Sequence, residues 1–166
     1  SAREVFQEID NTLNQNLFEL MCSGPEHELT LTANTQPALM AVSMAVVRVL
    51  EKEFGIALKD KAAFVAGHSL GEYSAACAAG VFSLADTARL LRARGDAMQK
   101  AVPFGVGGMA AVIGVSFKDI NALVEACRDE NNICVAANDN SDGQVVLSGN
   151  MAAIDRGAFP SSVSEV

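Results

Sequence analysis

The sequence lacks tryptophan, has a single tyrosine and contains few charged residues. Aromatic side chains make up 5% of the 166 residues, so large aromatic binding platforms are not expected. Charged residues make up 19%, and twelve basic against twenty acidic residues give a net charge of −8. An acidic chain is repelled by nucleic-acid phosphates and by anionic lipids. We therefore expect a soluble protein with neither nucleic acid nor membrane as a partner.

Histidines and paired cysteines are also scarce. The two histidines, His27 and His68, are too few for a histidine-rich site, and no metal is expected. No CxxC pair occurs among the four cysteines, which are Cys22, Cys77, Cys127 and Cys134. Buried free thiols of a reducing compartment fit this spacing better than disulfides do. We therefore expect a cytoplasmic protein.

No apolar run approaches the length of a membrane span, because charges interrupt every helix-like segment. The first residues, 1–6, have the pattern of an amphipathic helix rather than of a secretion signal.

Half of the residues are hydrophobic, which is enough for one domain with a real core, or for one domain and a small appendage.

The central feature is a Gly-x-Ser-x-Gly pentapeptide at residues 67–71, preceded by apolar residues and followed by an alanine-rich segment. This pattern predicts a strand that turns sharply into a helix, with Ser69 in a strained conformation at the turn. We expect that only glycine fits the crowded flanking positions, Gly67 and Gly71. Free N–H groups at the helix start would stabilise negative charge there. An ordinary helix start capped by Ser69 is the alternative.

Helical spacing predicts helices over residues 2–21, with a break near 14–16, and over residues 35 to about 54. The second is expected to begin at a cap, Asn34 or Thr35, with Pro37 in its first turn, and to end at Gly55. Its face of Leu39, Val42, Ser43, Val46, Val47, Leu50 and Phe54 is expected to be buried against a sheet.

Beyond the serine, helices are predicted over residues 70–79 and 84–100, and then a Pro/Gly-rich linker over 102–108. The remainder predicts strand 109–115, helix 117–128, strands 133–137 and 144–148 and a further helix, with a turn at 138–143. This order is most of a ferredoxin-like unit lacking its last strand. The expected domains are residues 1–104 and 105–166.

Several linked segments resemble the malonyl-CoA:acyl carrier protein transacylases of fatty-acid synthesis, up to about Arg156. They are residues 34–39 (NTQPAL), 67–75 (GHSLGEYSA), 92–95 (RARG), 98–99 (MQ), 107–112 (GGMAAV) and 138–146 (NDNSDGQVV). The resemblance implies an α/β fold with two incomplete parts: an α/β-hydrolase-like larger subdomain at 1–104 and a ferredoxin-like smaller subdomain at 105–166.

The activity implied is transfer of malonyl from malonyl-CoA to the phosphopantetheine thiol of acyl carrier protein. Ser69 would form a malonyl ester, and the backbone N–H of Leu70 would donate to the oxyanion. Arg94 matches the arginine that grips the malonyl carboxylate through two parallel hydrogen bonds. No cofactor is implied beyond the phosphopantetheine that the partner carries.

Three further residues match substrate-binding positions of the family, and each has a simpler alternative. His68 would line the acyl pocket or be a hydrogen-bonded core histidine. Met98 would line the pocket or be a core methionine. Asn140, like Asn138, would lie near the acyl group or simply be a turn residue.

The family's activating histidine lies downstream of these motifs, and this sequence has no histidine after His68. We therefore expect the chain to represent roughly half of the catalytic module and to be weak in catalysis on its own. Two other functions stay open: a serine esterase or thioesterase, and an inactive fragment that binds carrier protein. Docking of that acidic partner would need a basic patch, for which the candidates are Arg89, Arg92, Lys100 and Lys118.

Overall fold

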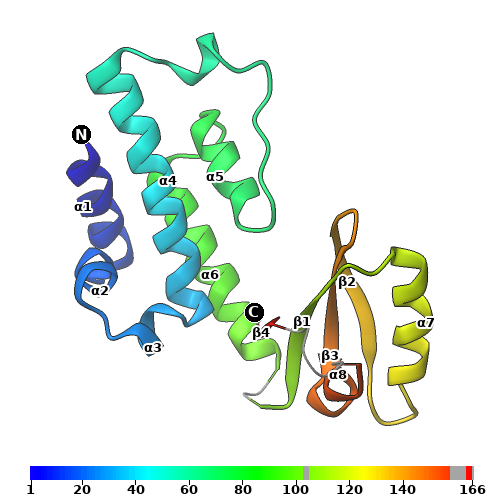
Figure 1. Ribbon diagram of the computed structural model, residues 1–166. Coiled ribbons are helices and arrows are strands. Elements are labelled where there is room, and N and C mark those ends of the chain that lie inside the picture. Colours follow the sequence, from blue (N-terminus) through cyan, green and yellow to red (C-terminus); the bar gives the residue numbers. More distant parts are fainter. Residues whose placement is uncertain (103–104, 158–163, 166) are drawn as a thin grey trace. The chain divides into compact units, whose positions relative to one another are not determined.

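The computed structural model describes residues 1–102, 105–157 and 164–165. The chain divides into two units, Ser1–Ala101 and Val102–Val166, which are treated separately below (Figure 1). Within the described residues, no helix is long and apolar enough to cross a membrane.

The first unit is helical. Its elements are α1 (Ala2–Leu13), α2 (Leu17–Ser23), α3 (Glu26–Leu29), α4 (Thr32–Phe54), the short 3-10 helix η1 (Leu58–Asp60), α5 (Gly71–Ala78) and α6 (Leu84–Ala101). Helices α1, α4 and α6 pack against one another, and α5 lies against α4 and α6 (Figure 1). The predicted break near residues 14–16 is confirmed, because α1 ends at Asn14 in the left-handed region.

Helix α4 differs from its prediction. It begins at Thr32, ahead of both predicted caps, so Pro37 lies inside the helix rather than in its first turn. Its buried face consists mainly of small and flexible side chains, including Ala38, Met40, Ala41, Met44 and Ala45. These let α4 approach its neighbouring helices closely. The predicted end at Gly55, which has a φ of 66°, is confirmed.

The face of α4 that was expected to cover a sheet is largely exposed, so this prediction is wrong for the described structure. Leu39 is 51% exposed, Val46 55% and Phe54 67%. The predicted strand before Ser69 is also not formed: residues 64–67 belong to no sheet, and Phe64 is 92% exposed. Both errors have one cause, because a strand needs a hydrogen-bonded neighbour and the described part of this unit supplies none.

One close contact brings the two longest helices together. A Cβ on Gly95 of α6 would lie 2.5 Å from the Cα of Ala33 on α4, which is closer than real side chains come. Glycine at this position therefore permits the two backbones to approach. The contact places the neighbouring Arg94 beside the first turns of α4.

Within its described residues, the second unit is a four-stranded antiparallel sheet with two helices. Its elements are β1 (Gly107–Ile113), α7 (Phe117–Cys127), β2 (Cys134–Ser141), β3 (Gln144–Asn150), α8 (Met151–Gly157) and β4 (Ser164–Glu165). The strand order is β2-β3-β1-β4. Helices α7 and α8 pack on strands of this sheet and against each other, over a core that includes Ile120, Leu147 and Ile154.

Two predictions for this unit are wrong. A last strand was not expected, yet β4 pairs with Ala110 and Ala111 of β1. Residues 138–141 were expected in a turn, but β2 continues through them with register shifts, and the turn comes at Asp142 and Gly143. Glycine at position 143 has a φ of 77°, which explains why the chain reverses there.

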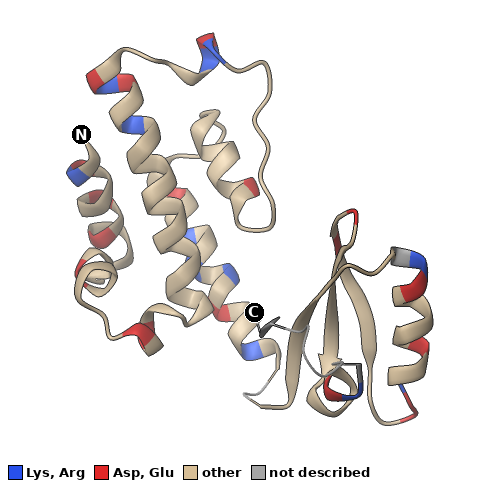
Figure 2. Ribbon diagram, in the orientation of Figure 1, with Lys and Arg blue, Asp and Glu red and all other residues tan. Residues whose placement is uncertain are grey.

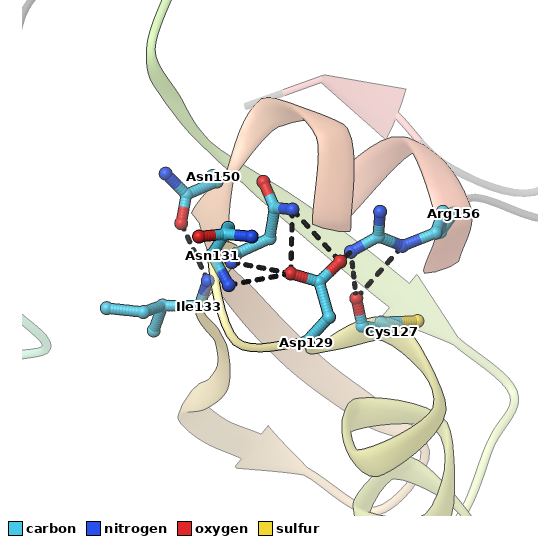
Figure 3. A network of polar contacts seen from close by, with 7 residues as sticks. Cys127, Asp129, Asn131, Ile133, Asn150 and Arg156 are labelled. Carbon is cyan, nitrogen blue, oxygen red and sulfur yellow. Dashed lines mark hydrogen bonds and ion pairs between the residues drawn. The ribbon is translucent and has the colours of Figure 1, made fainter.

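A polar network joins the end of α7 to α8 (Figure 3). The Asp129 carboxylate accepts hydrogen bonds from the backbone N–H groups of Asn131 and Asn132, at 2.8 and 2.9 Å. Arg156 donates to the carbonyl of Cys127 and pairs with Asp129 at 2.9 Å. These bonds to the charged form hold the pKa of Asp129 below its ordinary value, with the Asn131 N–H as the largest cause.

Candidate active site

Ser69 lies at the turn that leads into α5. Its φ of 55° is in the left-handed region, which confirms the predicted strain, since side chains other than glycine rarely adopt it. The N–H of Glu72 donates to the Ser69 carbonyl at 3.2 Å, and that of Gly71 donates to the His68 carbonyl at 2.8 Å. These bonds fold the chain tightly and leave the Ser69 side chain exposed at the helix start.

The two flanking glycines are not equivalent. A Cβ on Gly67 would lie 2.0 Å from the carbonyl carbon and oxygen of Gly71, so position 67 excludes every side chain. A Cβ on Gly71 would meet nothing within 4 Å. The expectation of crowding is therefore confirmed for Gly67 and wrong for Gly71.

Arg94 reaches the serine from α6. Its Nη2 donates to Ser69 Oγ at 2.9 Å, and its Nη1 donates to Gln36 Oε1. The guanidinium carbon also lies 5.9 Å from the centre of the Tyr73 ring, within the range of a cation–π contact. An arginine has five N–H groups, so donors remain for a ligand carboxylate beside the serine.

Gln36 belongs to the 34–39 segment of the sequence but was not predicted as a site residue. It lies on α4 with 3% of its surface exposed. Its side-chain nitrogen donates to Thr32 Oγ1 at 2.8 Å and to Met98 Sδ at 3.3 Å, while its oxygen accepts from Arg94. The available signal was a polar residue just before Pro37 and the mainly apolar stretch that follows it in the helix.

The other predicted site residues differ in how the structure places them. Met98 joins the cluster through Gln36, and Leu70 offers a backbone N–H for which the described residues provide no partner. His68 is exposed, so the alternative of a core histidine is wrong. Asn140 lies exposed on β2 of the second unit, and its role stays a prediction.

A second arginine of α6 has a different role from the one predicted. Arg92 donates to Asn34 Oδ1 at 2.8 Å and to Gln15 Oε1, and burial lowers the pKa of its guanidinium despite nearby Asp96. This side chain links α6 to α4 and to the connection between α1 and α2, so it is not a free cation for docking.

Arg89 on the same helix is also engaged, because it pairs with Asp86 at 3.0 Å. Figure 2 shows both basic and acidic residues along α6 and acidic residues along α1.

The described contacts give Ser69 a hydrogen-bond donor but no base. Its Oγ accepts from Arg94, and no histidine or carboxylate within the described ranges is hydrogen-bonded to it. A serine hydroxyl without a proton acceptor stays protonated at neutral pH and is a poor nucleophile. The same ranges contain no cluster of His, Cys, Asp or Glu that could hold a metal ion.

This geometry defines a class of active site. A serine at positive φ, next to a glycine that excludes a side chain and at the start of a helix, has the features of a nucleophile elbow. Comparison with protein families gives the particular one: the chain belongs to the acyl transferase domain family, whose model matches residues 1–158. The resemblance seen in the sequence motifs is thereby confirmed.

Relatives and solved structures agree with this assignment. The chain is 43% identical to a malonyl CoA-acyl carrier protein transacylase of Haemophilus influenzae, covering 93% of this chain and 48% of the relative. The corresponding protein of Bacillus subtilis is 42% identical, with 93% and 47% covered. The crystal structure of an acyl-carrier-protein-S-malonyltransferase from Bartonella henselae is similar with a TM-score of 0.88 and 56% identity, covering 94% of this chain and 49% of that one.

A fourth match is a type II PKS acyl-carrier protein in complex with its malonyl-transacylase. Its TM-score is 0.88 at 37% identity, with 99% of this chain and 54% of that chain covered. The chain thus spans about half the length of the relatives it matches.

Proposed function

We propose that the protein transfers a malonyl group from malonyl-CoA to the phosphopantetheine thiol of an acyl carrier protein. The contact between Arg94 Nη2 and Ser69 Oγ is the observation that carries this proposal, because it places a carboxylate-binding cation beside a nucleophile. The names of the relatives support the same substrate and acceptor.

In the first step, Ser69 Oγ attacks the thioester carbonyl and loses its proton to a base. The coenzyme A sulfur leaves as a thiol, and malonate remains as an ester on the serine. In the second step, the carrier thiol attacks this ester, and Ser69 regains its proton. Because the described contacts provide no base at Oγ, full activity requires one beyond them.

The remaining roles follow from position. The N–H of Leu70 at the start of α5 has no partner among the described residues and would donate to the oxyanion of each tetrahedral intermediate. The Arg94 guanidinium would hold the malonyl carboxylate and so favour malonyl over acetyl groups. Met98 and His68 would line the acyl pocket, and a substrate-binding role for Asn140 stays a prediction from the sequence motif at 138–146.

The architecture proposed for the intact protein has two parts. The second unit supports a ferredoxin-like subdomain, because its strand order β2-β3-β1-β4 is antiparallel throughout and two helices cover it. The first unit would be part of an α/β-hydrolase-like subdomain, with the Ser69 turn at the start of α5 as its nucleophile elbow.

The test is a labelling experiment on the intact protein. Incubation with malonyl-CoA should give a malonyl ester on Ser69, seen by mass spectrometry of the peptide that contains it, and Ser69→Ala should give none. The ester should persist until holo-acyl carrier protein is added and should then move to it. Free malonate without an acceptor would instead support the esterase alternative, and carrier binding without an ester would support a non-catalytic fragment.

A further inference from the structure

We propose that Gln36 is a positioning residue that sets the direction and the free charge of the Arg94 guanidinium. Through this, Gln36 would determine the preference for acyl groups that carry a carboxylate. This inference rests on the proposed function, since it concerns how the same site recognises malonyl.

The amide of Gln36 can face Arg94 in only one orientation, with its oxygen toward the guanidinium. Its nitrogen is committed to two acceptors, Thr32 Oγ1 at 2.8 Å and Met98 Sδ at 3.3 Å. Its oxygen is therefore turned to Nη1 of Arg94. A reversed amide would place N–H groups against the guanidinium, which accepts no hydrogen bond.

Burial makes this arrangement directional. Gln36 is 3% exposed, so water does not compete for its oxygen, and α4 fixes the side chain. With Nη1 held on Gln36, the guanidinium plane is oriented and Nη2 reaches Ser69 at 2.9 Å. The fork is thus aimed at the place where the acyl group would be attached.

The second contribution of Gln36 is that its amide carries no charge. A glutamate in the same position would form an ion pair with Arg94 and cancel the charge that a malonyl carboxylate needs. An amide holds the guanidinium through hydrogen bonding and leaves its full charge available. Glutamine therefore differs in function from a residue of almost the same shape.

A neighbouring pair in the same two helices provides a matched control. Asn34 on α4 holds Arg92 on α6 at 2.8 Å, as Gln36 holds Arg94 two positions further along each helix. Arg92 is also tied to Gln15 and has no contact with Ser69 among the described residues. The substitution Asn34→Asp therefore makes the same chemical change beside an arginine that lies outside the site.

The experiment measures binding rather than turnover, so it does not depend on a base. In intact Ser69→Ala protein, affinities for malonyl-CoA and acetyl-CoA are compared by isothermal titration calorimetry. Adding Gln36→Glu should lower the malonyl preference about 10- to 100-fold, the range expected for one charged hydrogen-bonded contact. Adding Asn34→Asp should leave the preference within about 2-fold, even where the melting temperature falls.

A second variant keeps the test informative if Gln36→Glu does not fold. Thr32→Val has nearly the same shape and removes one acceptor from the Gln36 amide, so it should lower the malonyl preference about 3-fold without changing acetyl-CoA affinity. An unchanged preference in both Gln36→Glu and Thr32→Val overturns the inference, as does an equal loss in Asn34→Asp. If the Ser69→Ala parent binds both thioesters equally, the proposed function fails, and this inference fails with it.

Discussion

Arg94 Nη2 donates a hydrogen bond to Ser69 Oγ at 2.9 Å, although the two residues come from separate segments 25 positions apart. The contact places a fixed positive charge beside the hydroxyl, which favours the development of negative charge on oxygen. The same guanidinium is held by Gln36 at its other amino group, so both ends of the fork are oriented before a ligand arrives.

Replacing Arg94 with lysine tests whether the planar fork matters or only the charge. An ammonium cannot make two parallel bonds to a carboxylate while it also contacts Gln36 and Ser69. In the Ser69→Ala background, Arg94→Lys should weaken malonyl-CoA binding about 10-fold and leave acetyl-CoA binding unchanged, as measured by calorimetry. Malonyl-CoA affinity equal to that of the parent would contradict a bidentate role.

Strain at the nucleophile predicts an unusual stability effect. Ser69→Gly should yield a protein about 1 kcal/mol more stable than Ser69→Ala, because glycine adopts a φ of 55° without steric cost. Both variants lose the hydroxyl and its bond to Arg94, so their difference isolates the backbone. Urea unfolding of the two proteins measures it, and equal free energies of unfolding would show that the turn is unstrained.

The two glycines around the serine should respond in opposite ways. Gly67→Ala should destabilise the protein by about 2 kcal/mol or more, because its Cβ would lie 2.0 Å from the backbone of Gly71. In Gly71→Ala the added Cβ would lie in open space in the first turn of α5, so the substitution should be neutral or stabilising by about 0.5 kcal/mol. Thermal unfolding of both variants is the measurement. A loss for Gly71→Ala as large as that for Gly67→Ala would contradict the geometry.

Local chemistry explains what the sequence predicted well. The pentapeptide predicted the strained turn at Ser69, since a sharp entry into a helix depends on a few adjacent residues. The break after α1 and the end of α4 at Gly55 were predicted for the same reason.

Features that depend on distant partners were predicted less well. Whether residues 64–67 form a strand depends on neighbouring strands, and whether Val46 is buried depends on what covers α4. Gln36 was missed because its role arises from Arg94 and Met98, which lie about sixty residues away. Spacing within α4 carries no information about those contacts.

Two arginines of α6 that do not contact Ser69, Arg89 and Arg92, offer a matched pair for stability. Arg92→Ala should cost about 1–3 kcal/mol, because it leaves the buried Asn34 without its charged partner. Arg89→Ala removes an exposed pair with Asp86 and should cost at most about 0.5 kcal/mol. Urea unfolding measures both. If both substitutions had equally small effects on the free energy of unfolding, Arg92 would be a surface cation available to bind an acidic partner.

The Asp129 carboxylate should make the stability of the second unit depend on pH. Its pKa is lowered in the folded state, chiefly by the Asn131 N–H, so the carboxylate contributes stability above the ordinary aspartate value of about 3.9. That contribution should disappear as the pH falls through the folded value, and the α7–β2 connection should then loosen from Arg156. Hydrogen exchange of peptides from α8 and β3, followed from pH 6 to pH 2, measures the effect. Asp129→Asn should exchange faster at pH 6 and show a weaker pH dependence.

The control for this experiment is Asp142→Asn, which removes the same charge from the exposed β2–β3 turn. It should leave exchange in α8 and its pH dependence as in the parent, because no described bond links Asp142 to Arg156. A parent protein whose α8 exchange follows only the intrinsic chemical rate between pH 6 and pH 2 would rule out a stabilising role for the Asp129 carboxylate. Equal changes in both variants would assign the effect to overall charge instead of to the network in Figure 3.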